Sequence, residues 1–117
     1  MPEQTAPLAL DRRYSDREFA RLSAGQIPQE MEDKWFVYYS EPCLYLHRSW
    51  TGICVYKVEF KPDERWFVVR NVIVNRDSSQ YTETNDVHDS MLLGILLDSR
   101  AGRDTKEQWD EYLAAKR

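Results

Sequence analysis

The side chains best suited to chemistry gather at one predicted β-hairpin, whose turn spans residues 49–52. If Ser49–Gly52 forms a four-residue turn, strand pairing places His47 opposite Cys54. A histidine beside a cysteine can act as a base that lowers the pKa of the thiol and creates a nucleophile. A buried thiol beside a hydrogen-bonded histidine is the plainer interpretation, and we favour it because free cysteines are usually buried and inert.

Arg48 and Trp50 indicate a second kind of chemistry at the same turn, the binding of an anion. An arginine beside Ser49, Thr51 and the backbone amides around Gly52 could hold a phosphate or a carboxylate. The tryptophan could stack on a base or pack beneath a partner chain. The alternative is a structural hairpin whose tryptophan closes a sheet end and whose arginine pairs with an acid.

Two further polar positions flank the predicted strands. The connector 31–35 carries Asp33 shortly before Trp35, where a carboxylate could act as a general base or pair with an arginine. Arg70 interrupts the apolar run 67–74, so it needs a partner or a ligand if it is covered. The plainer interpretations are a solvated strand entry and the exposed side of a half-buried strand.

These positions form a candidate binding set that lacks a catalytic signature: His47, Arg48, Trp50, Asp33, Trp35 and Arg70. Metal binding is not expected, because the histidines, cysteines and aspartates show no recognised ligand spacing. Asp86 and Asp89 stand near a predicted helix start, where the helix dipole explains them. No cofactor is expected either, since the chain has no phosphate-binding glycine loop, nucleophile elbow or zinc-protease helix.

Four strands and three helices are predicted to position these residues. The predicted strands are 35–39, 43–47, 53–60 and 66–74. The predicted helices are 15–24, a second from 84 or 85 to about 99, and a short last helix after Asp104. Short connections favour an antiparallel meander. The expected fold class is therefore α+β, with a four-stranded antiparallel meander sheet on which an N-terminal helix and two C-terminal helices pack.

Residue periodicity predicts which faces of these elements are apolar. Strand alternation along the hairpin groups Cys43, Tyr45, His47, Cys54, Tyr56, Val58 and Phe60 on one side of the sheet. In the second helix, Val87, Met91 and Ile95 recur at steps of four and predict the stripe that faces the core. His47 and Arg48 are neighbours in a strand, so they should point to opposite faces.

The length and the net charge limit the number of domains and the kinds of binding partner that can be expected. The 117 residues make one ordinary domain, expected to span residues 11–117 after a loose tail at 1–10 that contains Pro2 and Pro7. The formal net charge of −4 argues against general affinity for nucleic acid or for an anionic membrane. Two cysteines make no disulfide framework, and the first ten residues lack a signal-peptide pattern. A cytoplasmic protein with reduced thiols is expected.

Two strings in the chain resemble those of a known family. Residues 31–36 (MEDKWF) and 47–52 (HRSWTG) are similar to motifs in a family of short, uncharacterised bacterial proteins. The resemblance covers roughly residues 20–100. Similar modules sometimes stand beside ADP-ribose-processing domains, so the resemblance favours a nucleotide-like or ADP-ribosyl-linked ligand. No established activity accompanies the family, and it assigns no catalytic residue.

Three functions remain open on the sequence. The first is a small binding or accessory module for an anionic, nucleotide-like ligand or for a partner protein. The second is a homodimer or an inhibitor-type interaction protein, with which abundant tryptophan and tyrosine are compatible. The third is a small hydrolase or transferase that uses His47 as acid or base. We rank the binding module first, because arginine, aromatic and hydroxyl side chains cluster without a catalytic signature.

Overall fold

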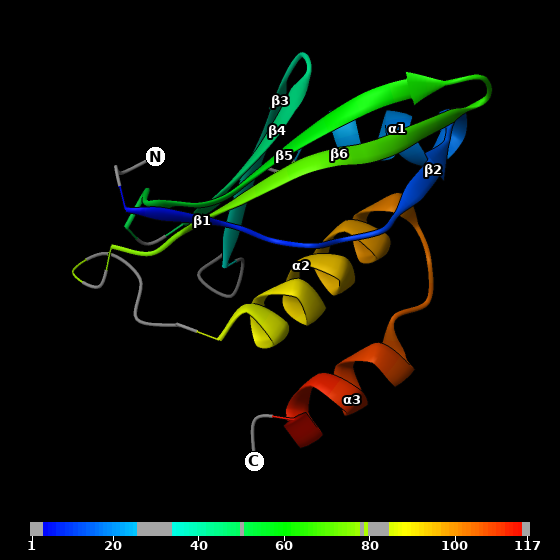
Figure 1. The fold of residues 1–117 in the computed structure, drawn as a ribbon. Helices are drawn as coiled ribbons and strands as arrows, with labels where there is room; N and C mark the ends of the chain where they lie inside the picture. Colours follow the sequence, from blue (N-terminus) through cyan, green and yellow to red (C-terminus); the bar gives the residue numbers. More distant parts are fainter. Residues whose placement is uncertain (1–3, 26–33, 50, 78, 80–84, 116–117) are drawn as a thin grey trace.

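All four predicted strands are present in the computed structural model, which describes residues 4–25, 34–49, 51–77, 79 and 85–115. The fold is α+β, with one antiparallel sheet and three helices (Figure 1). The strands are β1 (Thr5–Pro7), β2 (Arg13–Ser15), β3 (Trp35–Ser40), β4 (Cys43–Arg48), β5 (Cys54–Asp63) and β6 (Trp66–Asn75). The helices are α1 (Asp16–Ser23), α2 (Asp86–Ala101) and α3 (Lys106–Ala115).

The sheet has two more strands than the sequence predicts. Its order is β1-β6-β5-β4-β3, and β2 also pairs with β6. The segment expected to be a loose tail instead supplies β1, and the buried side chain of Leu8 follows it. Strand β6 is long, and its outer edge would expose unpaired backbone groups without these two short partners. Three-residue strands are too short to show the alternation by which strands are recognised.

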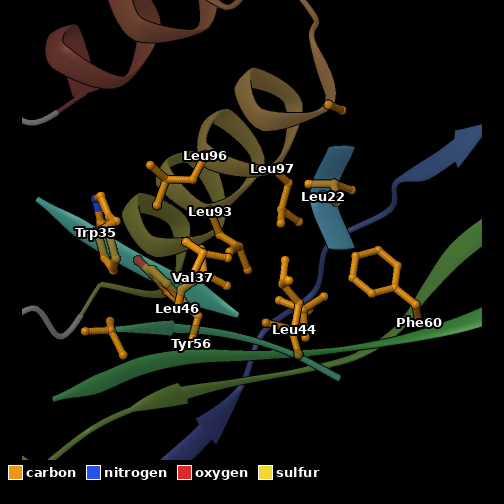
Figure 2. Packing of buried hydrophobic residues seen from close by; sticks show 14 of the residues in the cluster. Leu22, Trp35, Val37, Leu44, Leu46, Tyr56, Phe60, Leu93, Leu96 and Leu97 are labelled. Atoms are coloured by element: carbon orange, nitrogen blue, oxygen red, sulfur yellow. The ribbon is translucent and has the colours of Figure 1, made fainter. Parts of the chain in front are cut away.

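Helix α2 covers one face of the sheet and forms the core with it. Leu93 and Leu97 are fully buried, with Leu93 toward Val37 and Leu46 of the sheet and Leu97 beside Leu22 (Figure 2). Helix α1 packs on the same side, where Phe19 stacks on Phe67 with ring centroids 3.9 Å apart. We call this side of the sheet the inner face and the opposite side the outer face.

The position of α3 differs from the predicted one. Both C-terminal helices were expected to pack on the sheet, whereas α2 lies between the sheet and α3 (Figure 1). The core beneath the sheet contains no described residue of α3. A helix that packs on another helix needs a narrower apolar stripe than one that covers a sheet. Helix α3 is short and mostly exposed, so such a narrow stripe is enough to pack it on α2.

Local signals set the helix ends. Ser15 caps α1, and Glu18 completes a capping box with it. Asn85 caps α2 by accepting hydrogen bonds from the amides of Val87 and His88. Gly102 ends α2 in the left-handed conformation at φ 97°, which residues with a side chain rarely adopt. Within the described residues, no helix has the length and apolar character needed to cross a membrane.

A buried carboxylate attaches the C-terminal part of α2 to the N-terminal segment. Asp98 accepts a hydrogen bond from the hydroxyl of Tyr14 at 2.7 Å and lies 3.3 Å from the guanidinium of Arg12. Arg103, just beyond α2, approaches the same carboxylate and stacks over the Tyr14 ring. Burial and the hydrogen bond to Asp98 raise the pKa of Tyr14 far above its ordinary value, so its hydroxyl stays protonated.

Arg103 also forms an ion pair whose strength should depend on pH. Its guanidinium contacts both carboxylate oxygens of Glu18, at 2.6 and 3.1 Å, and this hydrogen bonding lowers the pKa of Glu18 from 4.5 to about 2. A lowered pKa in the folded state stabilises the fold above pH 4.5 and is lost as the pH falls toward 2. Because the pair is partly solvated, we expect a loss of about 1 kcal/mol or less.

Urea unfolding of the wild type and of R103Q between pH 5 and pH 2 measures this loss. The variant should show a shallower fall in the free energy of unfolding over that window, because Glu18 then loses the largest cause of its lowered pKa. Equal slopes in the two proteins would contradict the assignment.

Candidate functional site

The predicted hairpin forms, and its closing pairs are the expected ones. His47 pairs with Cys54, and the amide of Arg48 donates to the carbonyl of Ile53 at 3.0 Å. Beyond this point a β-bulge between Leu46 and His47 shifts the register by one residue. Leu46 therefore lies opposite Tyr56, where simple alternation places Tyr45.

Three backbone amides at the turn are already used within the protein. The amide of Gly52 donates to the carbonyl of Arg48 at 2.8 Å, and the amide of Ile53 donates to the hydroxyl of Thr51. The amide of Ser49 donates to the carbonyl of Lys34 at 3.0 Å. These three amides are therefore not open to an anion, which directs attention to the side chains at this end of the sheet.

The structure brings Arg48 and Trp35 together. They are cross-strand partners on β4 and β3, and the guanidinium of Arg48 lies 5.1 Å from the centre of the Trp35 ring. Trp35 is buried and stacks on Tyr56, with ring centroids 5.9 Å apart. Arg48 itself is exposed. A rigid aromatic ring therefore holds an exposed cation at the edge of the inner face.

Behind Trp35 lies a polar chain that the sequence prediction did not include. The hydroxyl of Tyr56 donates to Asp89 at 2.6 Å, and Arg76 lies 2.6 Å from the other oxygen of the same carboxylate. Asp89 is 1 % exposed, so this ion pair stands in the interior. The signal in the sequence is its spacing: Asp89 precedes Leu93 by one helical turn and so falls on the buried side of α2. The helix dipole alone does not explain a buried carboxylate.

His47 lies on the outer face, away from Arg48. Its ring stacks on Tyr38 at 5.5 Å and meets Phe36 edge-on at 5.9 Å. Burial lowers the pKa of His47 below its ordinary value, so the ring is neutral near pH 7. Its Nδ1 atom is buried and makes no hydrogen bond to a described residue. No carboxylate or thiol of the described residues is thus positioned to exchange a proton with this atom.

The thiol of Cys54 lacks the environment of a nucleophile. Its sulfur lies 3.6 Å from the carbonyl oxygen of Tyr56, toward which it can donate. Burial raises the pKa of Cys54, which disfavours the reactive thiolate. The backbone pairing of His47 and Cys54 therefore does not create a Cys–His nucleophile, and the packing interpretation accounts for both residues.

Arg70, another predicted site residue, is not joined to this end of the sheet. Arg70 is exposed and is the extra residue at an irregularity of β6, between the pairs Glu59–Asn71 and Phe60–Val69. That position is about 20 Å along the strands from the level of Cys54, at roughly 3.3 Å per residue. Asp33 and Trp50 lie outside the described residues.

A separate pocket of about 610 Å³ collects several arginines at the β2 edge. It is lined by Asp11, Arg12, Arg13, Trp66 and Arg103. Two of these cations are already paired, Arg12 with Asp98 and Arg103 with Glu18. Arg13 lies over the Trp66 ring at 4.6 Å. The carboxylates neutralise most of the positive charge in this pocket, so we assign its arginines to the attachment of α2.

Among the described residues, no group of three or more histidine, cysteine or acidic side chains could hold a metal ion. Comparisons with protein-family models, with curated proteins and with solved structures found no match to this chain.

Proposed function

We propose that the chain is a small binding module that holds an anionic, nucleotide-like molecule at the end of the sheet formed by Trp35 and Arg48. The observation that carries this proposal is the exposed guanidinium of Arg48 on the buried Trp35 ring, with no ion pair to any described residue.

A second cation supports the proposal. Lys34, which directly precedes Trp35, is exposed and makes no ion pair with a described residue. Its carbonyl accepts the amide of Ser49, so β3 and β4 hold Lys34 and Arg48 at the same end of the sheet. Two positive charges that no described carboxylate neutralises, at one end of a chain of net charge −4, favour an anionic ligand.

The chemistry of the arginine favours a phosphate joined to a flat ring. A guanidinium presents paired N–H donors that match two phosphate oxygens. Its plane can also stack on a base, as arginines do when proteins bind single-stranded nucleotides. The Trp35 ring is fixed by Tyr56, which in turn contacts the Asp89–Arg76 ion pair. Because the ring is already held in place, less conformational entropy is lost when a ligand binds.

Thermal unfolding with ADP, ADP-ribose and inorganic phosphate tests the proposal. A ligand present at about 100 times its Kd should stabilise the chain by about 2.7 kcal/mol and raise Tm by roughly 10 °C. R48Q should weaken binding about tenfold or more, because it removes the bidentate charge-assisted contact.

R70Q is the matched control, since Arg70 is also exposed but lies at a different level of the sheet. It should leave the affinity unchanged. If none of the three anions stabilises the wild type, or if R70Q weakens binding as much as R48Q, the proposed site is wrong.

A further inference from the structure

The outer face of the sheet has no described helix on it, and two neighbouring rows of its side chains run across the strands. Strand pairing places Tyr38, Tyr45, Lys57 and Ile73 side by side in one row, which we call the bulky row. The row two residues further along the strands contains Ser40, Cys43, Glu59 and Asn71, and we call it the small row.

The bulky row forms a ridge. Tyr38 and Tyr45 stack with centroids 5.0 Å apart, and the ammonium of Lys57 lies 5.8 Å from the Tyr45 ring. Tyr38 is 40 % exposed, although it lies within a strand. The stacked aromatic rings therefore form an ordered apolar surface, and no described element of the protein covers it.

A hollow lies at the β4–β6 part of the small row, beside the tyrosines. It has a volume of about 420 Å³ and is lined by Pro7, Pro42, Cys43, Lys57, Glu59, Asn71, Val72 and Ile73. Glu59 accepts a hydrogen bond from Asn71 at 2.8 Å, which keeps its carboxylate on this face. Lys57 and Ile73 border the hollow from the bulky row, so the two rows and the hollow lie on one surface.

We infer that the outer face binds the outer face of a second copy of this chain, as a two-fold symmetric dimer. Two sheets that pack face to face keep their strands roughly aligned, about 10 Å apart. A two-fold axis in the interface, perpendicular to β5 near Val58, reverses the strand direction of the second copy. Each bulky row then lies over the small row of the other copy, so Tyr38 faces Ser40 and Tyr45 faces Cys43 at the border of the hollow.

Charge identifies the second copy as the occupant. The same symmetry places Lys57 of each copy against Glu59 of the other, which makes two equivalent ion pairs. Two chains of net charge −4 repel each other, so self-association needs a surface whose own charges cancel. The two rows contain one lysine and one glutamate, whose opposite charges sum to zero. This contact is independent of the proposed anion site at Arg48.

Sedimentation equilibrium of charge-swapped variants tests the dimer. The wild type should reach twice the mass of the chain between micromolar and millimolar concentration. K57E and E59K should each raise the dimer dissociation constant about tenfold or more, because like charges then face each other twice. The double variant K57E/E59K restores both pairs in reversed form, and its dissociation constant should return to within about threefold of the wild type.

A pair of aromatic variants tests the apolar part of the contact. Y38K should dissociate the dimer, whereas W109K should not, since Trp109 is exposed to a similar extent, 38 %, but lies on α3. A wild type that stays monomeric throughout the range, or a double variant no better than the singles, would overturn the inference. Circular dichroism of each variant checks that it is folded, and Y38K decides the question should a charge variant fail to fold.

Discussion

Replacing Asp89 by alanine should reduce the free energy of unfolding by about 3–5 kcal/mol, because one partner of a buried ion pair is removed. The carboxylate is 1 % exposed, accepts a hydrogen bond from Tyr56 and forms an ion pair with Arg76. In D89A the Arg76 guanidinium, whose side chain is only 14 % exposed, keeps its charge but loses its buried counterion. Thermal unfolding should show Tm lower by roughly 10–20 °C for a chain of this length.

Asp86 provides the control for this prediction on the same arginine. It contacts Arg76 at 2.5 Å, but its side chain is 62 % exposed. Solvent screens such a pair, so D86A should change stability by about 1 kcal/mol or less. If D86A and D89A destabilise the protein equally, burial is not what gives the Asp89 pair its importance.

Replacing Leu93 by alanine should have the next largest effect, a loss of about 2–5 kcal/mol. Leu93 is fully buried between α2 and the sheet, close to Val37 and Leu46 (Figure 2). The substitution removes apolar contacts and leaves a cavity that a rigid sheet cannot close. Urea unfolding measures the loss as a lower midpoint with an unchanged slope.

Leu113 is the matched control, the same residue type on α3 with 51 % of its surface exposed. L113A should change the free energy of unfolding by about 0.5 kcal/mol or less. A loss in L113A comparable to that in L93A would mean that α3 is covered in solution by something that the described chain does not contain.

The local elements were predictable from local residues. The capping box of Ser15 and Glu18, the Asn85 cap and the stop at Gly102 marked helix ends that the structure contains. Runs of aromatic and β-branched residues predicted β3, β4, β5 and β6. These signals work because capping and strand propensity act within a few residues. Strands β1 and β2 were missed, since three residues that pair with a distant strand carry no such signal.

The faces of these elements were harder to predict. Periodicity in α2 favoured Val87 on the core side, yet Val87 is 66 % exposed and Leu93 and Leu97 face the sheet. In the hairpin, one bulge moved Tyr56 to the inner face with Leu46, while His47 stayed on the outer face. A bulge or a small rotation leaves the composition unchanged but reverses which side chains are buried.

The β4–β5 hairpin separates what the sequence determines from what the tertiary structure decides. By itself the sequence determined that His47 and Arg48 point to opposite faces, because neighbouring residues alternate along any strand. Only the tertiary structure decided what each face contains. The support behind Trp35 joins Tyr56 to Asp89 across 33 residues, and Tyr14 reaches Asp98 across 84. Such contacts depend on how the chain folds back on itself, which local residue patterns do not encode.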